Sequence, residues 1–254
     1  MTNKVKEIKY FCAKCYQDYT QDISICPFCK NRLIKKEIYW DLEAHGYFIK
    51  ISSLIALKNM RKGAIWFRPP VYFNRYEQDD VIGDSQEFLV QVDPDDKKFD
   101  PNINKKLIFC MYFLTTDKNG NYSIPEQDKD NLQKFGNSVS FISFAKFKKL
   151  IEKYVIREAN KIVGNHVSYY TDKMCGAINP FFKRIKYNYQ NEYRFILEDE
   201  RFLSLYNEDG SLKEDKFVYK HRRNLKKVFS KPIDLEIILN SQNEKDWDHL
   251  IKMY

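Results

Sequence analysis

Glycine is scarce in this chain, and the motifs that depend on clustered glycines are absent. The 254 residues include eight glycines, which are scattered along the sequence. There is no G-x-G-x-x-G, no P-loop and no G-x-S-x-G, and each of these needs glycine where the backbone turns tightly beside a ligand or a nucleophile. The sequence therefore excludes a doubly wound dinucleotide fold, a P-loop NTPase and an α/β-hydrolase.

Histidine and long apolar runs are also lacking. The four histidines lie far apart, with no H-E-x-x-H and no pair at the spacing of metal ligands, so a histidine metal centre is not expected. No run approaches the ~18 apolar residues of a membrane-spanning helix, and the opening sequence MTNKVKEIKY lacks the apolar segment of a secretory signal. We therefore expect a soluble cytoplasmic protein with no membrane partner.

Cysteine is present in a distinctive pattern, because four of the six cysteines form two C-x-x-C pairs near the N-terminus. Each pair places two thiolates on a tight turn, and the intervening residues 16–25 are long enough to bring all four sulfurs around one tetrahedral ion. Two disulfides or a redox centre are the alternative, although a redox motif is usually single and adjoins a βαβ unit. The pattern predicts a structural zinc (Zn2+) site formed by Cys12, Cys15, Cys26 and Cys29.

Four thiolate ligands leave a zinc ion no open position, so this metal is not expected to be catalytic. It would stabilise a zinc-ribbon module over residues 1–40, because so short a segment buries too little apolar surface to fold alone. The remaining residues, 41–254, are long enough for one sizeable core. We expect the chemistry there, and we expect Cys110 and Cys175 to be buried free thiols.

The charge is positive overall, with 43 basic and 35 acidic residues, and it is unevenly distributed. Residues 216–231, KFVYKHRRNLKKVFSK, carry seven Lys or Arg, no acid and interleaved aromatic residues. Such a mixture suits contact with single-stranded nucleic acid through phosphates and stacked bases, while a solvated loop and strand is the alternative. The candidate nucleic-acid contacts are Arg222, Arg223, Lys226 and Lys227.

Residues 77–100 have the opposite charge, with nine acidic residues and two lysines. Clustered carboxylates can gather Mg2+ or Mn2+ for phosphodiester cleavage, because hard cations prefer oxygen ligands. The segment lacks a lysine at the spacing of a D-x(n)-E-x-K nuclease motif, and a solvated acidic loop is the alternative. The candidate carboxylates are Glu77, Asp79, Asp80, Asp84 and Glu87.

The alternation of apolar residues predicts that 41–254 form an α+β domain with mainly antiparallel sheets and a few helices. A strand (GYFIKI), a short helix capped by Ser52 or Ser53, and a second strand (AIWFRPPVYF) open this domain. Residues 144–164 carry the strongest helical stripe and are expected to form one helix that ends at Gly164. Residues 34–46 are expected to connect the zinc module to the domain. Later strands are expected over HVSYYT, KRIKYNY, YRFILE, KFVYK and LEIILN.

The polar triplet Gln190, Glu192 and Arg194 is the best candidate for chemistry. At the strand period of two, the three side chains share one face, opposite an aromatic face. This arrangement places a carboxylate at the mouth of a groove. A half-exposed antiparallel strand with a Glu–Arg pair is the structural alternative.

Gln190-x-Glu192 resembles the Q/E-x-E signature of ADP-ribosyltransferases, and the order of elements over 47–240 is similar to that superfamily. The segments GAIWFRPPVYFNRYEQDDVIGDSQEF, FCMYFLT and FFKRIKYNYQNEYRF also resemble an uncharacterised bacterial family associated with the same fold. The resemblance implies transfer of ADP-ribose from NAD to a macromolecule. Glu192 would be the catalytic carboxylate that contacts the ribose 2′-hydroxyl, and Gln190 would orient the acceptor.

The same resemblance implies contacts with NAD. Lys50, at the C-terminal end of the first strand, would contact the pyrophosphate or ribose, and Tyr72, after Pro69-Pro70, would stack on the nicotinamide. Lysine stands here where arginine-type enzymes have Arg, and the second-strand Ser-Thr-Ser is missing.

Nucleic acid is the favoured acceptor of ADP-ribose, and protein is the second. A non-enzymatic zinc-ribbon protein that binds nucleic acid is the alternative function, with the metal-dependent nuclease as a further one.

Overall fold

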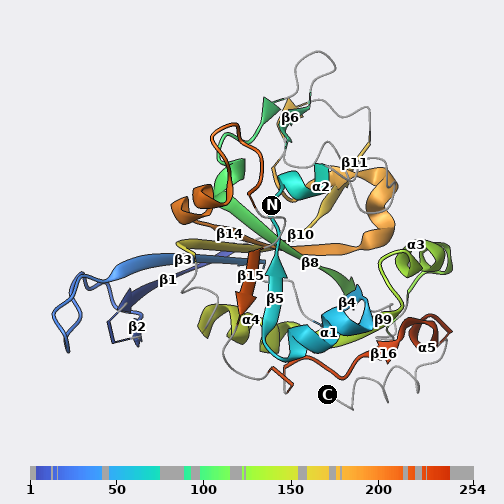
Figure 1. Cartoon of the computed structure of the whole chain (residues 1–254), viewed down its shortest axis with the longest axis horizontal. Coiled ribbons are helices and arrows are strands. Elements are labelled where there is room, and N and C mark those ends of the chain that lie inside the picture. The colour runs from blue at the N-terminus through green and yellow to red at the C-terminus, as the bar shows by residue number, and fades with distance from the viewer. Residues whose placement is uncertain are drawn as a thin grey trace.

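A nine-stranded sheet forms the centre of the fold (Figure 1). The computed structural model describes residues 4–12, 14–15, 17–41, 46–74, 89–92, 98–114, 122, 124–153, 159–171, 176–177, 179–213, 217–220, 225–226 and 228–240. From one edge to the other, the strands of this sheet are β16 (Ile233–Asp234), β9 (Ser138–Ser143), β4 (Tyr47–Ser52), β8 (Lys106–Leu114), β14 (Glu192–Glu198), β10 (Lys161–His166), β3 (Ile34–Asp41), β1 (Lys4–Cys12) and β2 (Gln17–Tyr19).

Adjacent strands of this sheet pair antiparallel, except β10 and β3, which are parallel. Smaller sheets are formed by β11 (Ser168–Tyr170) with β13 (Phe182–Arg184), by β6 (Leu89–Val92) with β7 (Lys98–Phe99) and β12 (Gly176–Ala177), and by β5 (Ala64–Phe67) with β15 (Phe217–Lys220).

The α-helices of the described residues are α1 (Leu54–Arg61), α2 (Val71–Asn74), α3 (Lys129–Gln133), α4 (Phe144–Lys153) and α5 (Leu235–Asn240). Short 3-10 segments are η1 (Ile103–Lys105), η2 (Glu126–Asp128), η4 (Ile185–Gln190) and η5 (Glu200–Leu205). The predicted combination of mainly antiparallel strands with few helices is confirmed, and most of these strands belong to one large sheet.

One face of the sheet carries the main hydrophobic core, and α1 and α4 cover that face (Figure 1). Tyr193, Phe195 and Leu197 of β14 are fully buried in this core. Phe147 of α4 meets Phe195 with ring centroids 4.5 Å apart. Because successive side chains of a strand alternate between its faces, the intervening residues of β14, including Glu192, are directed to the other side of the sheet.

The helix predicted over residues 144–164 is wrong over its last residues, 159–164. α4 ends at Lys153, residues 154–158 lie outside the described residues, and 161–166 form β10. Gly164, predicted to stop the helix, lies inside this strand, where a Cβ would approach the Trp40 ring to 2.7 Å. The β-branched Ile162 and Val163 favour the strand, which the helical periodicity of the preceding residues obscured. The buried stripe is confirmed for Phe147, Leu150 and Ile151.

Four further segments differ from their predictions, and the first is VYF of the predicted second strand AIWFRPPVYF, which lies in α2. Residues 34–46, predicted to be a connection, contain β3, which pairs with β1 and β10 and so joins the cysteine hairpin to the central sheet. LEIILN forms α5 rather than a strand, because Leu235, Ile238 and Leu239 are buried at helical spacing while Ile237 is 55% exposed. KRIKYNY is divided between β13 and η4. None of the helices in the described part of the chain is long and apolar enough to cross a membrane.

Candidate active site and metal centre

A cavity of about 280 Å³ lies where β4 and β8 separate. The two strands pair over three residues, from Tyr47 opposite Leu114 to Ile49 opposite Tyr112. Beyond this point β4 continues along β9, and β8 continues along β14. Residues from β4, α1, β5, α2, β8, α3, β13, η4 and β14 line the resulting space. The separation of the two central strands therefore creates an opening within an otherwise continuous sheet.

The cavity brings together side chains that sequence reasoning placed in one site. Lys50, Tyr72, Gln190 and Glu192 all line it. They come from β4, α2, η4 and β14, which are distant in sequence. Arg68, Cys110 and Lys183 also line it and were not predicted as site residues.

Glu192 is the one carboxylate among the described residues that line the cavity, and two cations hold it. Its Oε1 accepts a 2.6 Å hydrogen bond from Arg194 Nε, while Oε2 has longer contacts of 3.4 Å with Arg194 Nη2 and Lys183 Nζ. Burial alone would raise the pKa of Glu192, but the charges of Arg194 and Lys183 outweigh it and hold that pKa well below its usual range. Glu192 is therefore ionised, and Oε2 is its less tightly held oxygen.

Gln190 also lines the cavity, but it does so from a different element than the predicted strand. It ends η4 rather than lying in the strand, and Asn191 takes a left-handed φ of 33° before β14 begins at Glu192. The predicted alternation along a single strand is therefore wrong at Gln190. Lys183 nevertheless joins the two residues, because its Nζ donates a 2.7 Å hydrogen bond to Gln190 Oε1 and lies 3.4 Å from Glu192 Oε2.

Lys50 spans the opening between the separated strands. Its Nζ donates a 2.7 Å hydrogen bond to the carbonyl oxygen of Cys110 and lies 4.9 Å from the centroid of the Phe109 ring. The carbonyl would lack this partner without Lys50, since β4 no longer pairs with β8 here. Burial lowers the pKa of Lys50, and the nearby charge of Arg68 lowers it further.

Arg68 places a second cation at the cavity beside the predicted aromatic residue. Its backbone exchanges two 2.8 Å hydrogen bonds with Ile108 of β8, which fixes the end of β5 against the opening. Its guanidinium lies 3.8 Å from the centroid of the Tyr72 ring, within the range of a cation–π contact. Arg68 stands directly before Pro69-Pro70 in the sequence. This position was the sequence signal that could have identified Arg68 as a cavity residue.

The cavity has an excess of positive charge. Lys50, Arg68 and Lys183 face one carboxylate, Glu192, among its described lining residues. Glu192 is already balanced by Lys183 and Arg194. Lys50 is close enough to feel the charge of Glu192, but neither Lys50 nor Arg68 forms a salt bridge in the described part of the chain. The arrangement therefore favours an anionic ligand.

The thiol of Cys110 also lies in the cavity, next to the carboxylate. Burial raises its pKa, and the charge of Glu192 raises it further. A thiol with a raised pKa stays protonated and is a poor nucleophile. The chemistry of the cavity is therefore carried by its carboxylate, amide and cationic groups.

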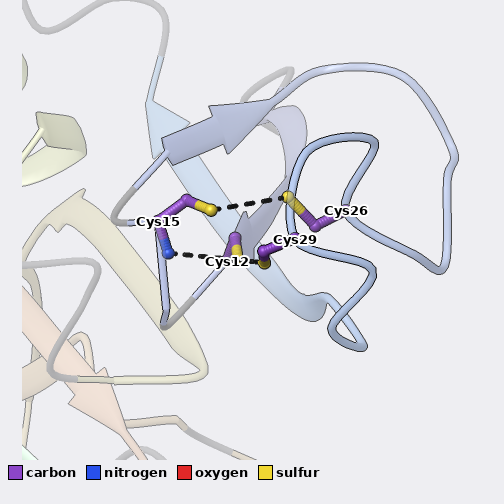
Figure 2. A group of neighbouring side chains, drawn as sticks. All are labelled: Cys12, Cys15, Cys26 and Cys29. Atoms are coloured by element: carbon purple, nitrogen blue, oxygen red, sulfur yellow. Dashed lines mark hydrogen bonds between the residues drawn. The ribbon is translucent and has the colours of Figure 1, made fainter.

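The four predicted cysteine ligands lie together in the β1–β2–β3 hairpin, and Figure 2 shows their side chains turned toward one another. Their sulfur atoms all lie within 4.8 Å of each other, with Cys12 and Cys29 at 3.4 Å and Cys15 and Cys26 at 3.9 Å. The corners of a tetrahedron with Zn–S bonds of about 2.3 Å are about 3.8 Å apart. The cluster can therefore hold a metal ion and is consistent with zinc.

Groups around the cluster favour an ionised sulfur at Cys26. Its Sγ lies 3.3 Å from the Tyr19 hydroxyl. Burial alone would raise the pKa of Cys26, but hydrogen bonds from Tyr19 and from the backbone amides of Cys29 and Phe28 lower it to about 6. The neighbouring sulfurs act in the other direction on Cys15, where the hydrogen bond with Cys29 and burial raise the pKa to about 12. Four ionised sulfurs at these distances require a cation between them.

The two charged segments singled out in the sequence fall largely outside the described residues. This applies to the acidic candidates Glu77, Asp79, Asp80, Asp84 and Glu87, and to Arg222, Arg223 and Lys227. Lys226 is described and exposed. Phe229, one of the interleaved aromatic residues, is 1% exposed in the main core, so its ring is not available for stacking on a base.

No known protein family, curated protein or solved structure matches the chain. The cavity and the cysteine cluster are therefore the features from which a function can be inferred.

Proposed function

We propose that this protein transfers ADP-ribose from NAD to a macromolecular acceptor, at the cavity between β4 and β8. The observation that carries the proposal is the convergence of Lys50, Tyr72, Gln190 and Glu192 on one cavity. The excess of positive charge supports it independently, because the pyrophosphate of NAD supplies the missing anion. An ADP-ribosyltransferase-like arrangement of the domain is part of the same proposal.

The size of the cavity limits which part of NAD it can enclose. At about 280 Å³, it lies just below the usual range of about 300–1,000 Å³ for small-molecule sites. It accommodates the nicotinamide and its ribose, with the adenosine end at the mouth. Apolar walls from Leu57, Met60 and Trp66 suit the flat nicotinamide ring.

Each predicted residue has a role that follows from its contacts. Lys50 and Arg68 bind the pyrophosphate, since neither forms a salt bridge in the described part of the chain. Tyr72, whose ring already lies beside the Arg68 guanidinium at 3.8 Å, stacks on the nicotinamide. Glu192 accepts a hydrogen bond from the ribose 2′-hydroxyl at Oε2, its less tightly held oxygen.

Glu192 acts through its charge rather than as a base. A carboxylate whose pKa is held low is a weak proton acceptor, but it stabilises positive charge that develops on the ribose. The bond from ribose C1′ to the nicotinamide nitrogen breaks with its electron pair on nicotinamide. The acceptor nucleophile then bonds to C1′ and loses its proton to solvent. Gln190, held by Lys183 at 2.7 Å, orients the acceptor.

We propose that the ion held by the cysteine cluster is zinc and that its role is structural. The support is chemical, since four sulfurs at tetrahedral spacing match the preferred ligands of zinc and leave no open coordination position. Nucleic acid is the favoured acceptor of ADP-ribose, with protein second. The hairpin that carries the cluster provides a surface for contact with that acceptor.

The transfer is tested by incubating the protein with NAD labelled on its adenylate and with RNA, DNA and protein as acceptors. Glu192→Gln keeps the shape of the side chain and should reduce both acceptor labelling and nicotinamide release by at least about 100-fold, as loss of a transition-state charge contact does. Gln190→Leu should reduce labelling more than nicotinamide release, because it acts on the acceptor. Wild-type protein that neither labels an acceptor nor releases nicotinamide would contradict the proposal.

Glu198→Gln is the matched control for the carboxylate. Glu198 lies on the same strand, is paired with Lys161 at 3.4 Å and is 31% exposed outside the cavity. The Glu198→Gln variant should keep wild-type activity. Circular dichroism at the assay temperature shows that each variant is folded, which separates loss of chemistry from loss of structure.

A further inference from the structure

The turn that carries Cys26 and Cys29 exposes an aromatic ring on a well-ordered backbone. Phe28 lies between the two cysteines and is 72% exposed. The amide of Lys30 donates to the carbonyl of Cys26 at 3.0 Å, and the amide of Cys26 donates to the carbonyl of Asn31 at 2.8 Å. Because both ends of the turn are held, little conformational entropy is lost when a ligand packs on the ring.

The turns that carry the four cysteines also expose apolar and basic side chains. Ile25 is 56% exposed and forms an antiparallel bridge with Arg32, so the two side chains lie on the same face as cross-strand neighbours. Lys30 and Arg32 are exposed. Lys14 is also exposed, on the turn between the first two cysteines of the same cluster. We name these residues the knuckle surface: Lys14, Ile25, Phe28, Lys30 and Arg32.

The three cations of the knuckle surface have no acidic partner in the described part of the chain. Two acids of the same hairpin are each within salt-bridge distance of another lysine, Glu7 with Lys9 at 3.3 Å and Glu37 with Lys35 at 3.1 Å. A third acid, Asp22, interacts with the Tyr10 hydroxyl. The surface therefore combines an exposed ring, an apolar neighbour and unbalanced positive charge. That combination is complementary to a base and the phosphates on either side of it.

We propose that the knuckle surface binds single-stranded nucleic acid, with one base stacked on Phe28 and flanking phosphates held by Lys14, Lys30 and Arg32. The small size of the surface favours this partner, because a stable protein interface buries about 800 Å² on each side, far more than these five side chains present. Unpaired bases are required, since a stacked base must leave its own helix.

The knuckle surface is separate from the cavity. Figure 1 shows the ends of β1, β2 and β3 projecting away from α1, β4 and β5. The idea that the knuckle surface binds the acceptor of ADP-ribose rests on the proposed transfer function. Binding of nucleic acid to this surface can be measured without NAD, so failure of one proposal is distinguishable from failure of the other.

The binding is tested by fluorescence anisotropy with labelled oligo(dT) and oligo(U), using the full-length protein with its metal. Phe28→Ala should weaken the affinity about tenfold, the usual effect of losing one stacked base. The double variant Lys30→Gln/Arg32→Gln should make the slope of log K against log salt shallower by about 1.4, as expected for two lost phosphate contacts on a single strand. Equal metal content in all proteins shows that the cluster is intact.

Ile55→Ala and Lys58→Gln on α1 are matched controls, because Ile55 is 73% exposed and Lys58 is exposed on an unrelated surface. Both should bind like the wild type. The proposal is overturned if the wild type binds neither oligonucleotide, if it prefers a polyglutamate chain, or if Phe28→Ala binds as tightly as Ile55→Ala. A Phe28→Ala protein that loses binding but still releases nicotinamide supports the knuckle surface and leaves the chemistry in the cavity.

Discussion

The cysteine cluster and the cavity are both sites, but they are assembled in different ways. The cluster takes its four ligands from one hairpin, between Cys12 and Cys29. The cavity takes its lining from elements between β4 and β14, which meet only because the central sheet opens between β4 and β8. The first site could be read from local spacing, whereas the second depends on long-range strand pairing.

The two sites also favour ligands of opposite charge. Four clustered sulfurs accumulate negative charge as they ionise and are balanced by a cation. The cavity holds three cations against one carboxylate among its described lining residues and is balanced by an anion. In our proposal a metal ion and a dinucleotide are the complementary partners of two different parts of one chain, and removing either should leave the other site functional.

Removal of the metal should have the largest effect and should be confined to the hairpin. Metal binding contributes on the order of 10 kcal/mol to folding in comparable four-ligand modules. A chelator, or Cys26→Ser, should therefore abolish amide protection over residues 17–33, while NAD affinity is kept. Hydrogen exchange and a metal assay measure this. The Cys110→Ser variant, which is altered outside the cluster, should keep the metal of the cluster. Amide protection that is unchanged after chelation would contradict a structural role for the metal.

Loss of the carboxylate should destabilise the cavity in a pH-dependent way. Glu192→Gln leaves buried Arg194 and Lys183 without their anion, which should lower the free energy of unfolding at pH 7 by about 3 kcal/mol. The folded-state pKa of Glu192 lies below its ordinary value of 4.5. The ionised group therefore contributes stability that is fully present above pH 4.5 and is lost as pH falls through the folded pKa.

Thermal unfolding of wild type and Glu192→Gln between pH 7 and pH 2 measures this contribution. The difference between the two proteins should stay constant down to about pH 4.5 and then shrink. Glu198→Gln should differ from wild type by less than about 1 kcal/mol throughout, as expected for a partly exposed pair. A Glu192→Gln difference that does not change at low pH would contradict the ion-pair account.

A smaller effect is expected from Gly136→Ala, which deforms the cavity without touching the cluster. Gly136 has a φ of 145°, and a Cβ there would lie 2.4 Å from the backbone of Ser52 at the end of β4. We expect about 2 kcal/mol of destabilisation, weaker NAD binding and normal metal content. Gly210→Ala is the control, because its φ of 78° is also positive but no atom lies within 4 Å of the added Cβ. Equal destabilisation by both substitutions would show that the contact with Ser52 is unimportant.

The sequence predicted the elements whose signals are local. The strand at β4, the helix α1 with Ser53 as its cap, and the strand at β14 all lie where expected. β10 and α5 were missed because short apolar runs fit both helix and strand until their tertiary neighbours are known. For β10 those neighbours are β14 and β3, which no local pattern could supply.

The same reasoning explains what was missed in the cavity. Glu192 and Lys50 could be proposed from motif and strand position, but Lys183 could not, because its contact with Glu192 requires the turn at Asn191 and the path of β13. Arg68 reaches the opening through its backbone pairing with Ile108. Such residues are identified only when the strand order and the separation of β4 from β8 are known.

The most direct test of the central claim is a calorimetric titration of NAD into wild type, Lys50→Met and Lys58→Met. Lys50 spans the opening in the sheet, whereas Lys58 is exposed on α1, so the two substitutions remove the same charge from different places. We predict that NAD binds the wild type and Lys58→Met equally, and that Lys50→Met binds at least about tenfold more weakly, as expected for loss of a charged contact. Absence of binding to the wild type, or equal affinity of all three proteins, would contradict the assignment of the cavity to NAD.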